Sequence, residues 1–84
     1  MSASAPTLAT FSPRQRIVLE LLSLGQHYDQ IAATLSISIH TVRRHLDQSA
    51  ARLPEEFYPG VACLRRLLMY YAVATANDQY RLVA

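Results

Sequence analysis

Residues 31–45 read IAATLSISIHTVRRH and carry the signals for two helices with a very short connection between them. In the first part, apolar side chains recur at the spacing of one helix face. These residues are Ile31, Ala32 and Leu35. A short helix over residues 28–35 is therefore expected, with Asp29 in its first turn, where a negative charge is favourable. Residues 36–38, Ser-Ile-Ser, leave room only for a tight turn.

The second part of this stretch begins a longer helix, expected over residues 39–53. Ser38 suits its N-cap because a serine side chain accepts a hydrogen bond from a free backbone N–H of the first turn. The apolar positions again share one helix face. They are Val42, Leu46, Ala50 and Leu53. Pro54 ends the helix because its ring disfavours helical geometry in the residue before it.

Another helix is expected ahead of this pair. Ser12 fits its N-cap, Pro13 its first position, and Gln15 completes a capping box. Apolar residues then repeat at helical spacing until Gly25, which suits a C-terminal cap. Residues 1–10 are small and include Ser, Ala and Pro, and they are expected to form a flexible arm.

A fourth helix is expected over residues 61–76, after a loop at residues 54–60 that contains two prolines and a glycine. Arg65 and Arg66 interrupt a segment that is otherwise apolar almost all the way round. Such a helix needs apolar neighbours on two sides, which its own core and a second subunit would supply. Residues 77–84 are left as a tail without assigned structure.

Composition agrees with a single small globular domain. The chain has 84 residues and is 51% hydrophobic, which excludes an intrinsically disordered protein. Its net charge is only +2, and all eight cationic residues are arginines, which bind phosphates and guanine edges well. The lone Cys63 excludes an internal disulfide. A cytoplasmic protein is expected, because the N-terminus does not resemble a signal peptide and residues 67–76 are too short to span a bilayer.

The two helices joined at residues 36–38 fit a helix-turn-helix unit. In such a unit the second helix enters the major groove of DNA while the first braces it across the backbone. The outward face of the helix expected over residues 39–53 would then decide which base edges are read.

The same residues resemble the DNA-binding domain of the LuxR/GerE type over residues 11–53, about half of the chain. The resemblance rests on a run of residues and its spacing. The matching positions are Phe11, Ser12, Arg14, Gln15, Val18, Leu19, Leu21, Gly25, Ile31, Ala32, Leu35, Ile37, Ser38, Thr41, Val42, Arg43, His45, Arg52 and Leu53.

The resemblance implies an all-α fold of four helices, with the third as recognition helix and the fourth as the dimer helix. It implies double-stranded DNA as the partner. The positions expected to contact DNA are Ser38, Thr41, Arg43, Arg44, His45, Asp47 and Gln48. The positions expected at a dimer interface are Val61, Leu64, Leu68, Met69 and Tyr71.

The chain departs from the family pattern at several positions. Gln15 and Gln30 stand where the family usually has Glu, and His27 stands where it usually has Ser, which alters the cap of the second helix. Asp47 replaces a basic or polar residue. It either accepts a hydrogen bond from a cytosine amino group or pairs with an arginine one turn back. After Leu53 the family pattern fails, which leaves the details of dimerisation open.

Four arginines outside the recognition helix have two interpretations each. Arg14 and Arg16 are either surface charges or phosphate contacts. Arg65 and Arg66 either contact the DNA backbone beside the site or are solvated or paired with the acidic residues 55–56, and the second interpretation, solvation or pairing, is favoured. His45 is either a phosphate donor, as the resemblance implies, or a packed and hydrogen-bonded histidine.

Metal binding and catalysis find no support in the sequence. The three histidines, His27, His40 and His45, match no zinc spacing, and one cysteine provides too few soft ligands. No nucleophile, base and orienting group can be assembled from motifs, and no glycine-rich phosphate loop is present. No cofactor and no enzymatic activity are expected.

Two function classes follow. The first is a homodimeric transcription regulator that reads an inverted-repeat operator. The alternative is a protein-binding inhibitor that captures another LuxR-type regulator or RNA polymerase through its fourth helix. Asp47, the acidic residues 55–56 and the low net charge favour the alternative slightly. A module like the C-terminal helix-turn-helix of sigma factors ranks lower, because that relative often has Arg at the position of His45.

Overall fold

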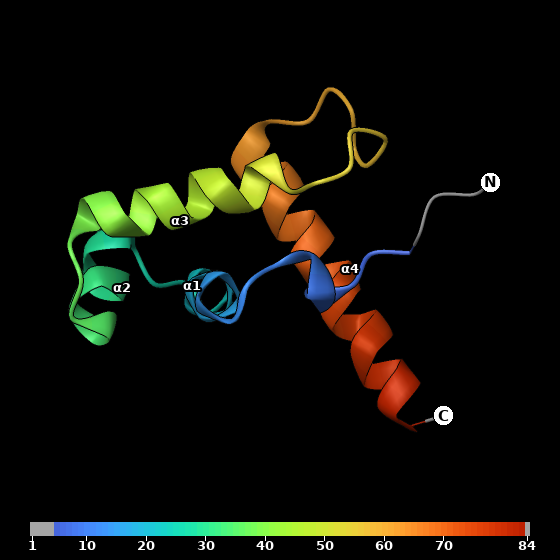
Figure 1. The fold of residues 1–84 in the computed structure, drawn as a ribbon, viewed down its shortest axis with the longest axis horizontal. Coiled ribbons are helices and arrows are strands. Elements are labelled where there is room, and N and C mark those ends of the chain that lie inside the picture. The colour runs from blue at the N-terminus through green and yellow to red at the C-terminus, as the bar shows by residue number, and fades with distance from the viewer. Residues whose placement is uncertain (1–4, 84) are drawn as a thin grey trace.

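The computed structural model describes residues 5–83, and of residues 80–83 only the backbone. This part of the chain is all-α and has four α-helices and one short 3-10 helix, as Figure 1 shows. The elements are η1 (Leu8–Thr10), α1 (Pro13–Ser23), α2 (Tyr28–Leu35), α3 (Ile39–Ala51) and α4 (Cys63–Val83). The predicted four-helix fold is confirmed. None of the described helices is both long enough and apolar enough to cross a membrane.

Helix α1 begins and ends as its capping residues predict. The backbone N–H of Gln15 donates to Ser12 Oγ at 3.2 Å, and the N–H of Ser12 donates back to Gln15 Oε1 at 3.0 Å. At the other end Gly25 has a φ of 93°, a conformation that costs little without a β-carbon. The N–H groups of Gly25 and Gln26 then donate to the carbonyls of Leu22 and Leu21, which closes a Schellman motif.

The turn between α2 and α3 is as short as expected. Ser36 has a φ of 56°, in the left-handed region, and the N–H of Ile37 donates to the carbonyl of Ala32 at 3.0 Å. Two residues later Ser38 Oγ accepts from the backbone N–H of Thr41 at 3.1 Å and caps α3. Ser36, in the left-handed conformation, thus ends α2 and turns the chain, and Ser38 caps the start of α3.

One core joins all four α-helices. Its buried side chains are Phe11, Val18, Leu19, Ile31, Ala32, Val42, Leu46, Leu53, Leu67, Tyr70, Tyr71 and Ala74. Aromatic rings fill the part beside α4, where Phe11 and Phe57 each meet Tyr70 edge to face, with ring centroids 5.7 Å and 5.3 Å apart. This core positions α3 across one side of the molecule (Figure 1).

The N-terminal segment differs from the flexible arm that was expected. Residues 1–4 lie outside the described residues, but Thr7 caps η1, and the chain packs against α4. The N–H of Leu8 donates to Asp78 Oδ2 at 3.2 Å, and Asn77 Nδ2 donates to the carbonyl of Pro6 at 3.0 Å. The segment is ordered because it contacts residues some 70 positions away in sequence, and a local sequence pattern does not reveal such contacts.

The boundaries of the last two helices also differ from expectation. Helix α3 ends at Ala51, and Leu53 is buried just after it. Helix α4 begins at Cys63 and continues to Val83, through most of the segment expected as a tail. It can continue this far because residues 63–84 contain no glycine or proline that would end the helix.

Arg66 anchors the loop between α3 and α4. Its guanidinium donates to two backbone carbonyls, from Nε to Phe57 and from Nη2 to Pro54, both at 2.6 Å. The favoured expectation for this residue, solvation or pairing with the acidic residues 55–56, is wrong for Arg66. The loop bends back on itself instead, with Tyr58 in the left-handed region at a φ of 56°, and presents its carbonyls to α4.

Candidate nucleic-acid interface

Helix α3 presents a polar face to solvent and an apolar face to the core. The exposed residues recur at helical spacing. The polar ones are His40, Arg43, Arg44, Asp47 and Gln48, and the apolar Ile39 and Ala51 are exposed at the two ends of the helix. Val42 and Leu46 are buried on the opposite face, and so is Ser49, whose hydroxyl donates to the carbonyl of His45 at 2.7 Å. The inward face therefore holds the helix in place, and the outward face is free for a partner.

The start of α3 carries two hydroxyl groups. Ser38 Oγ lies 3.0 Å from Thr41 Oγ1, in addition to its capping bond. Ser38 is exposed and Thr41 is half-buried. The N-terminus of a helix carries a partial positive charge, so hydroxyl donors placed there suit an anionic partner such as a phosphate.

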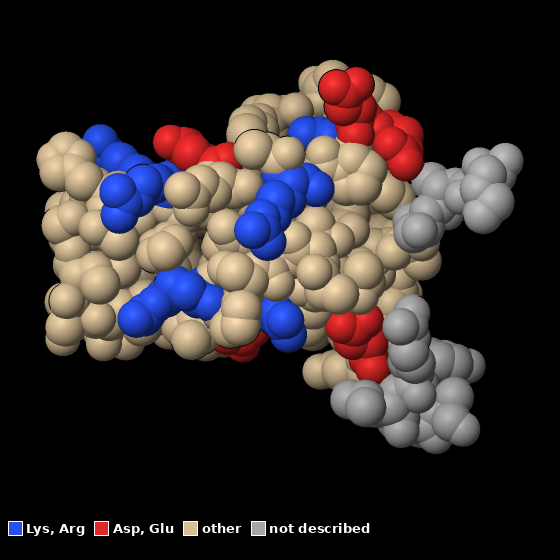
Figure 2. Space-filling model, in the orientation of Figure 1, with Lys and Arg blue, Asp and Glu red and all other residues tan. Residues whose placement is uncertain are grey.

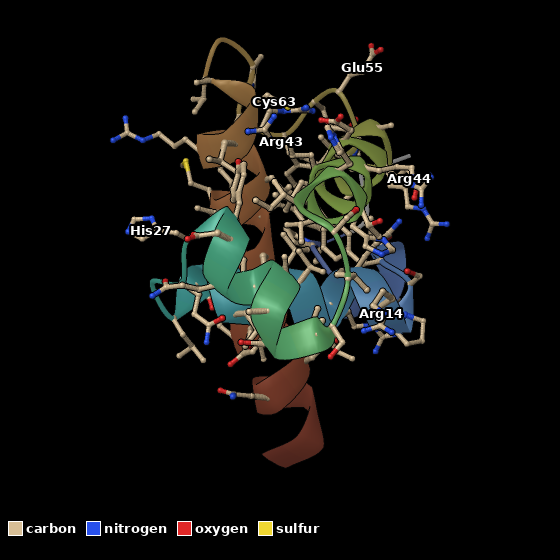
Figure 3. The ribbon with its side chains drawn as sticks, turned by 90° about the vertical axis from the view of Figure 1, so that its left-hand side faces the viewer. Arg14, His27, Arg43, Arg44, Glu55 and Cys63 are labelled. Atoms are coloured by element: carbon tan, nitrogen blue, oxygen red, sulfur yellow. The ribbon has the colours of Figure 1, made fainter. Side chains whose placement is uncertain are left out.

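Arg43 and Arg44 leave α3 on different sides, as Figure 3 shows. The guanidinium carbon of Arg43 lies 6.0 Å from the centre of the Tyr28 ring on α2, at the distance of a cation–π contact. On this side Asp47 lines a small groove of about 150 Å³ together with Tyr28 and Cys63. Arg43 is thus steadied by an aromatic ring and has an acid on the same flank.

The opposite flank of α3 is basic. Arg44 and, from α1, Arg14 extend toward the same side of the molecule in Figure 3. His45 lies half-buried here, and its pKa is lowered below 6.5 by burial and then by the positive charges of Arg14 and Arg44. The imidazole is therefore neutral near pH 7.

Charge is unevenly spread over the surface. Figure 2 shows basic side chains over α3 and α1 on the viewed face, while acidic side chains lie toward its margins. Two acidic residues, Glu55 and Glu56, are exposed in the loop before α4. A basic face that includes an exposed helix is the electrostatic footprint of a nucleic-acid-binding surface.

The comparison with protein families agrees with this geometry. The family described as bacterial regulatory proteins of the luxR family, GerE, matches residues 9–54, which include α1, the turn at residues 36–38 and the whole of α3. The chain belongs to the LuxR family. The family is one of DNA-binding transcription regulators with a helix-turn-helix domain, and the chain is in consequence assigned to that class of protein. The curated proteins and the solved structures gave no match.

The LuxR family match ends at residue 54, before α4 begins at Cys63. Of the residues expected at a dimer interface, Leu64 and Met69 are 41% and 38% exposed. Leu68 is half-buried and lines an apolar groove of about 460 Å³ between α1 and α4. Val61 is half-buried and precedes the helix.

Tyr71 differs from the other residues of that set. It is buried within a single copy of the chain, and its hydroxyl donates to Glu20 Oε1 of α1 at 2.5 Å. Burial, followed by this contact with Glu20, raises the pKa of Tyr71 to about 12. Its side chain therefore joins α4 to α1 and is taken out of the expected dimer surface, where the exposed Val73 is a better candidate.

All seven positions expected to contact DNA lie on α3 or at its N-cap. Five of them are exposed, and Thr41 and His45 are half-buried. His40 is not among the seven positions, yet it is exposed four residues before Arg44 on the same helix face. The i, i+4 spacing from Arg44 was the signal that would have found it.

The departures at the helix starts have a simple structural outcome. Gln30 Oε1 accepts from the backbone N–H of His27 at 2.8 Å, as Gln15 does for Ser12 at α1. In both helices a glutamine side-chain amide oxygen thus accepts the hydrogen bond from the N-cap backbone N–H, in place of the usual glutamate carboxylate. The imidazole of His27 makes no capping hydrogen bond, so α2 starts with a weaker cap than the serine usual in LuxR proteins would provide.

Proposed function

We propose that this protein is a sequence-specific transcription regulator that binds an inverted-repeat operator as a homodimer. The observation that carries the proposal is the outward face of α3, which is polar, carries two arginines and is exposed along the whole helix. The 13 residues of α3 extend over about 20 Å at 1.5 Å per residue. A helix of this size fits into the major groove, which is about 12 Å wide.

Individual side chains suit particular parts of the groove. Arg44 lies near the middle of the exposed face and suits the O6 and N7 atoms of guanine, while Gln48, one turn on, suits adenine. Asp47 suits the amino group of cytosine. Ser38 and Thr41 at the start of α3 suit a backbone phosphate, which would set the register of the helix in the groove.

The homodimer is proposed to form through the outward face of α4. Met69 and Val73, one turn apart, leave apolar surface exposed there, while Leu64 is nine residues from Val73 and so lies on the opposite flank of the helix. Between Cys63 and Asn77 the helix carries no acidic residue, and the exposed Arg65, one turn before Met69, puts a positive charge at the edge of this apolar surface. In a two-fold dimer the two α3 helices would enter successive major grooves about 34–36 Å apart.

The proposal is tested by selecting binding sites from random duplex DNA with the purified protein and then measuring affinity against salt. We expect an enriched inverted repeat and a steep fall in affinity as salt rises, because each neutralised phosphate releases counterions. Absence of an enriched sequence, together with weak binding even at low salt, would contradict the proposal.

Met69→Glu tests the dimer surface. A carboxylate placed in an apolar interface loses its hydration, so we expect the dimer to dissociate and binding to the full inverted repeat to weaken with it. Met69→Leu is the matched control, since it keeps an apolar side chain of similar volume. Sedimentation equilibrium and affinity for the full repeat provide the measurements. A Met69→Glu protein that stays dimeric would place the interface elsewhere.

The same selection experiment tests a second candidate function, that of a protein-binding inhibitor. A protein-binding inhibitor would use the exposed apolar face of α4 to capture another LuxR-type regulator or RNA polymerase. The observation that favours it is Asp47, a carboxylate on the outward face of α3, where it would approach DNA phosphates. Salt-sensitive DNA binding by the chain alone would decide against this inhibitor.

A further inference from the structure

We infer that the outer face of α1 binds the same face of a second copy of this chain, with the two helices antiparallel about a two-fold axis near residue 18. The contact lies on a different helix from the dimer surface proposed on α4. It involves no DNA, so its test does not depend on the proposed function.

The outer face of α1 is a short, largely apolar stripe. Pro13, Ile17, Glu20 and the C-cap residue Leu24 follow one another at intervals of four, three and four residues, which is the spacing of one helix face. All four are exposed. Leu24 at 69% and Ile17 at 45% are the most exposed of the large apolar side chains in the described part of the chain, ahead of those on α4. Exposed apolar surface gathered on one face marks a protein contact.

A hollow of about 270 Å³ in the surface lies beside this stripe. Arg16, Ile17 and Leu21 line it from α1, and Tyr71 lines it from α4 next to its hydrogen-bond partner Glu20. Side chains of one helix pack into the hollows between side chains of another. A second helix laid along the stripe could therefore place an apolar side chain here.

The charges on this face indicate which helix that is. Arg16 and Glu20 lie one turn apart, and both line the hollow. Arg16 Nε donates to the carbonyl of Phe11 and one oxygen of Glu20 accepts from Tyr71, but neither side chain has an opposite charge as its partner among the described residues. In an antiparallel pair of α1 helices, Arg16 of each copy faces Glu20 of the other, and two-fold symmetry forms both ion pairs at once. The face is therefore complementary in charge to itself.

The register of the pair follows from these charges. With residue 16 of one copy opposite residue 20 of the other, the two-fold axis passes at residue 18. Ile17 then lies about 1.5 Å along the helix from the axis, beside its own counterpart. Leu24 lies about 9 Å from the axis and packs near Pro13 of the other copy. The two copies of Leu24 are thus about 18 Å apart along the helices, farther than a disulfide can span.

The size of the face sets the strength of the contact. The 11 residues of α1 span only about 16 Å, so the pair buries less surface than a stable interface does. Dilute protein is not held together by this face alone. The contact instead joins molecules that are already close, such as dimers on neighbouring DNA sites, where the local concentration is high. Covalent trapping can detect a contact of this kind.

The experiment introduces single cysteines into a Cys63→Ser protein, because Cys63 is exposed and would form disulfides of its own. Ile17→Cys and Leu24→Cys are oxidised mildly without DNA, and covalent dimer is measured by non-reducing electrophoresis. We expect Ile17→Cys to crosslink about 10-fold faster, since only position 17 lies at the axis. Random collisions would give the opposite order, because position 24 is more exposed.

Charge reversal tests the two ion pairs. Arg16→Glu places carboxylates opposite one another, so crosslinking through Ile17→Cys should slow about 5-fold at low salt and recover at high salt. Arg14→Glu is the matched control, because it changes the net charge equally but lies on the other side of the stripe, and it should leave the rate unchanged. Glu20 is kept in all variants, because its carboxylate also holds Tyr71.

Met69→Glu separates this contact from the proposed α4 dimer. Added to the cysteine proteins, it should leave the faster crosslinking at position 17 intact, because α4 contributes no cysteine to the disulfide. Crosslinking that disappears with Met69→Glu would belong to the α4 dimer and would overturn the inference. Equal rates at positions 17 and 24, or no crosslinking at either, would also overturn it. A protein that crosslinks at position 17 but binds no DNA would contradict the proposed function alone.

Discussion

Helices α3 and α4 bury one face each in the same core but expose opposite kinds of surface. Outward from α3 are charged and amide side chains such as Arg44 and Gln48, while outward from α4 are the apolar Met69 and Val73, with the exposed Arg65 one turn before Met69. Only the inner faces of α3 and α4 contribute side chains to the hydrophobic core. The outer faces are therefore available for partners, and their chemistry suits α3 to nucleic acid and α4 to protein.

The largest expected effect comes from the inner face that the two helices share. Leu67 is 1% exposed in the core beneath α4. Leu67→Ala should lower the free energy of unfolding by about 2–5 kcal/mol, since it removes buried methyl groups and leaves a cavity. The matched control is Leu64→Ala on the outer face, expected within about 0.5 kcal/mol for the isolated chain. Urea unfolding measures both. Equal losses would mean that the inner and outer faces of α4 are not distinct.

The next effect concerns the outer face of α3. Arg44→Ala should weaken operator binding by about 1–3 kcal/mol if the side chain contacts guanine, with specificity relaxed at one base pair. Arg43→Ala should weaken it less, because Arg43 already leans over the Tyr28 ring and shares its flank with Asp47. Fluorescence anisotropy on the operator and on single-base variants measures the two. A larger loss for Arg43→Ala would reverse the assignment of the flanks.

The smallest effect tests how α4 is held against α1. Tyr71→Phe removes the hydrogen bond to Glu20 and should cost about 0.5–1.5 kcal/mol of unfolding free energy. In the wild-type protein the pKa of Tyr71 is raised to about 12, above the ordinary value near 10, so folding favours the protonated phenol. This contribution is complete below pH 10 and should disappear as pH rises toward 12. Thermal unfolding against pH should show that loss in the wild type, and Tyr71→Phe should lack this component of it.

Local signals accounted for much of the fold and of the candidate site. Ser12, Gln15, Gly25 and Ser38 act on backbone groups within six residues, and each of these caps lies where its chemistry places it. The seven positions expected to contact DNA lie on α3 because helical periodicity relates nearby residues. The roles of these residues toward bases and phosphates stay predictions.

The missed features depend on residues that are far apart in sequence. Arg66 was expected to be solvated or to pair with the acidic residues 55–56, yet its guanidinium binds the carbonyls of Pro54 and Phe57 on either side of them, because the loop folds back onto α4. Tyr71 lies in an apolar stretch of sequence and was expected at the dimer surface, but its hydroxyl binds Glu20, 51 positions away, and this contact holds it in the core.

By itself the sequence determined the four helices, their caps and the helix-turn-helix, since these follow from hydrogen bonds and periodicities that act within a few residues. Only the tertiary structure decided which apolar residues of α4 stay exposed, that residues 6–10 pack on α4, and that Arg14 and Arg44 extend to the same side. The physical reason is that the local sequence of an apolar helix face does not specify which other segment will pack against it. Whether it meets the core, solvent or a partner depends on which distant segment covers it.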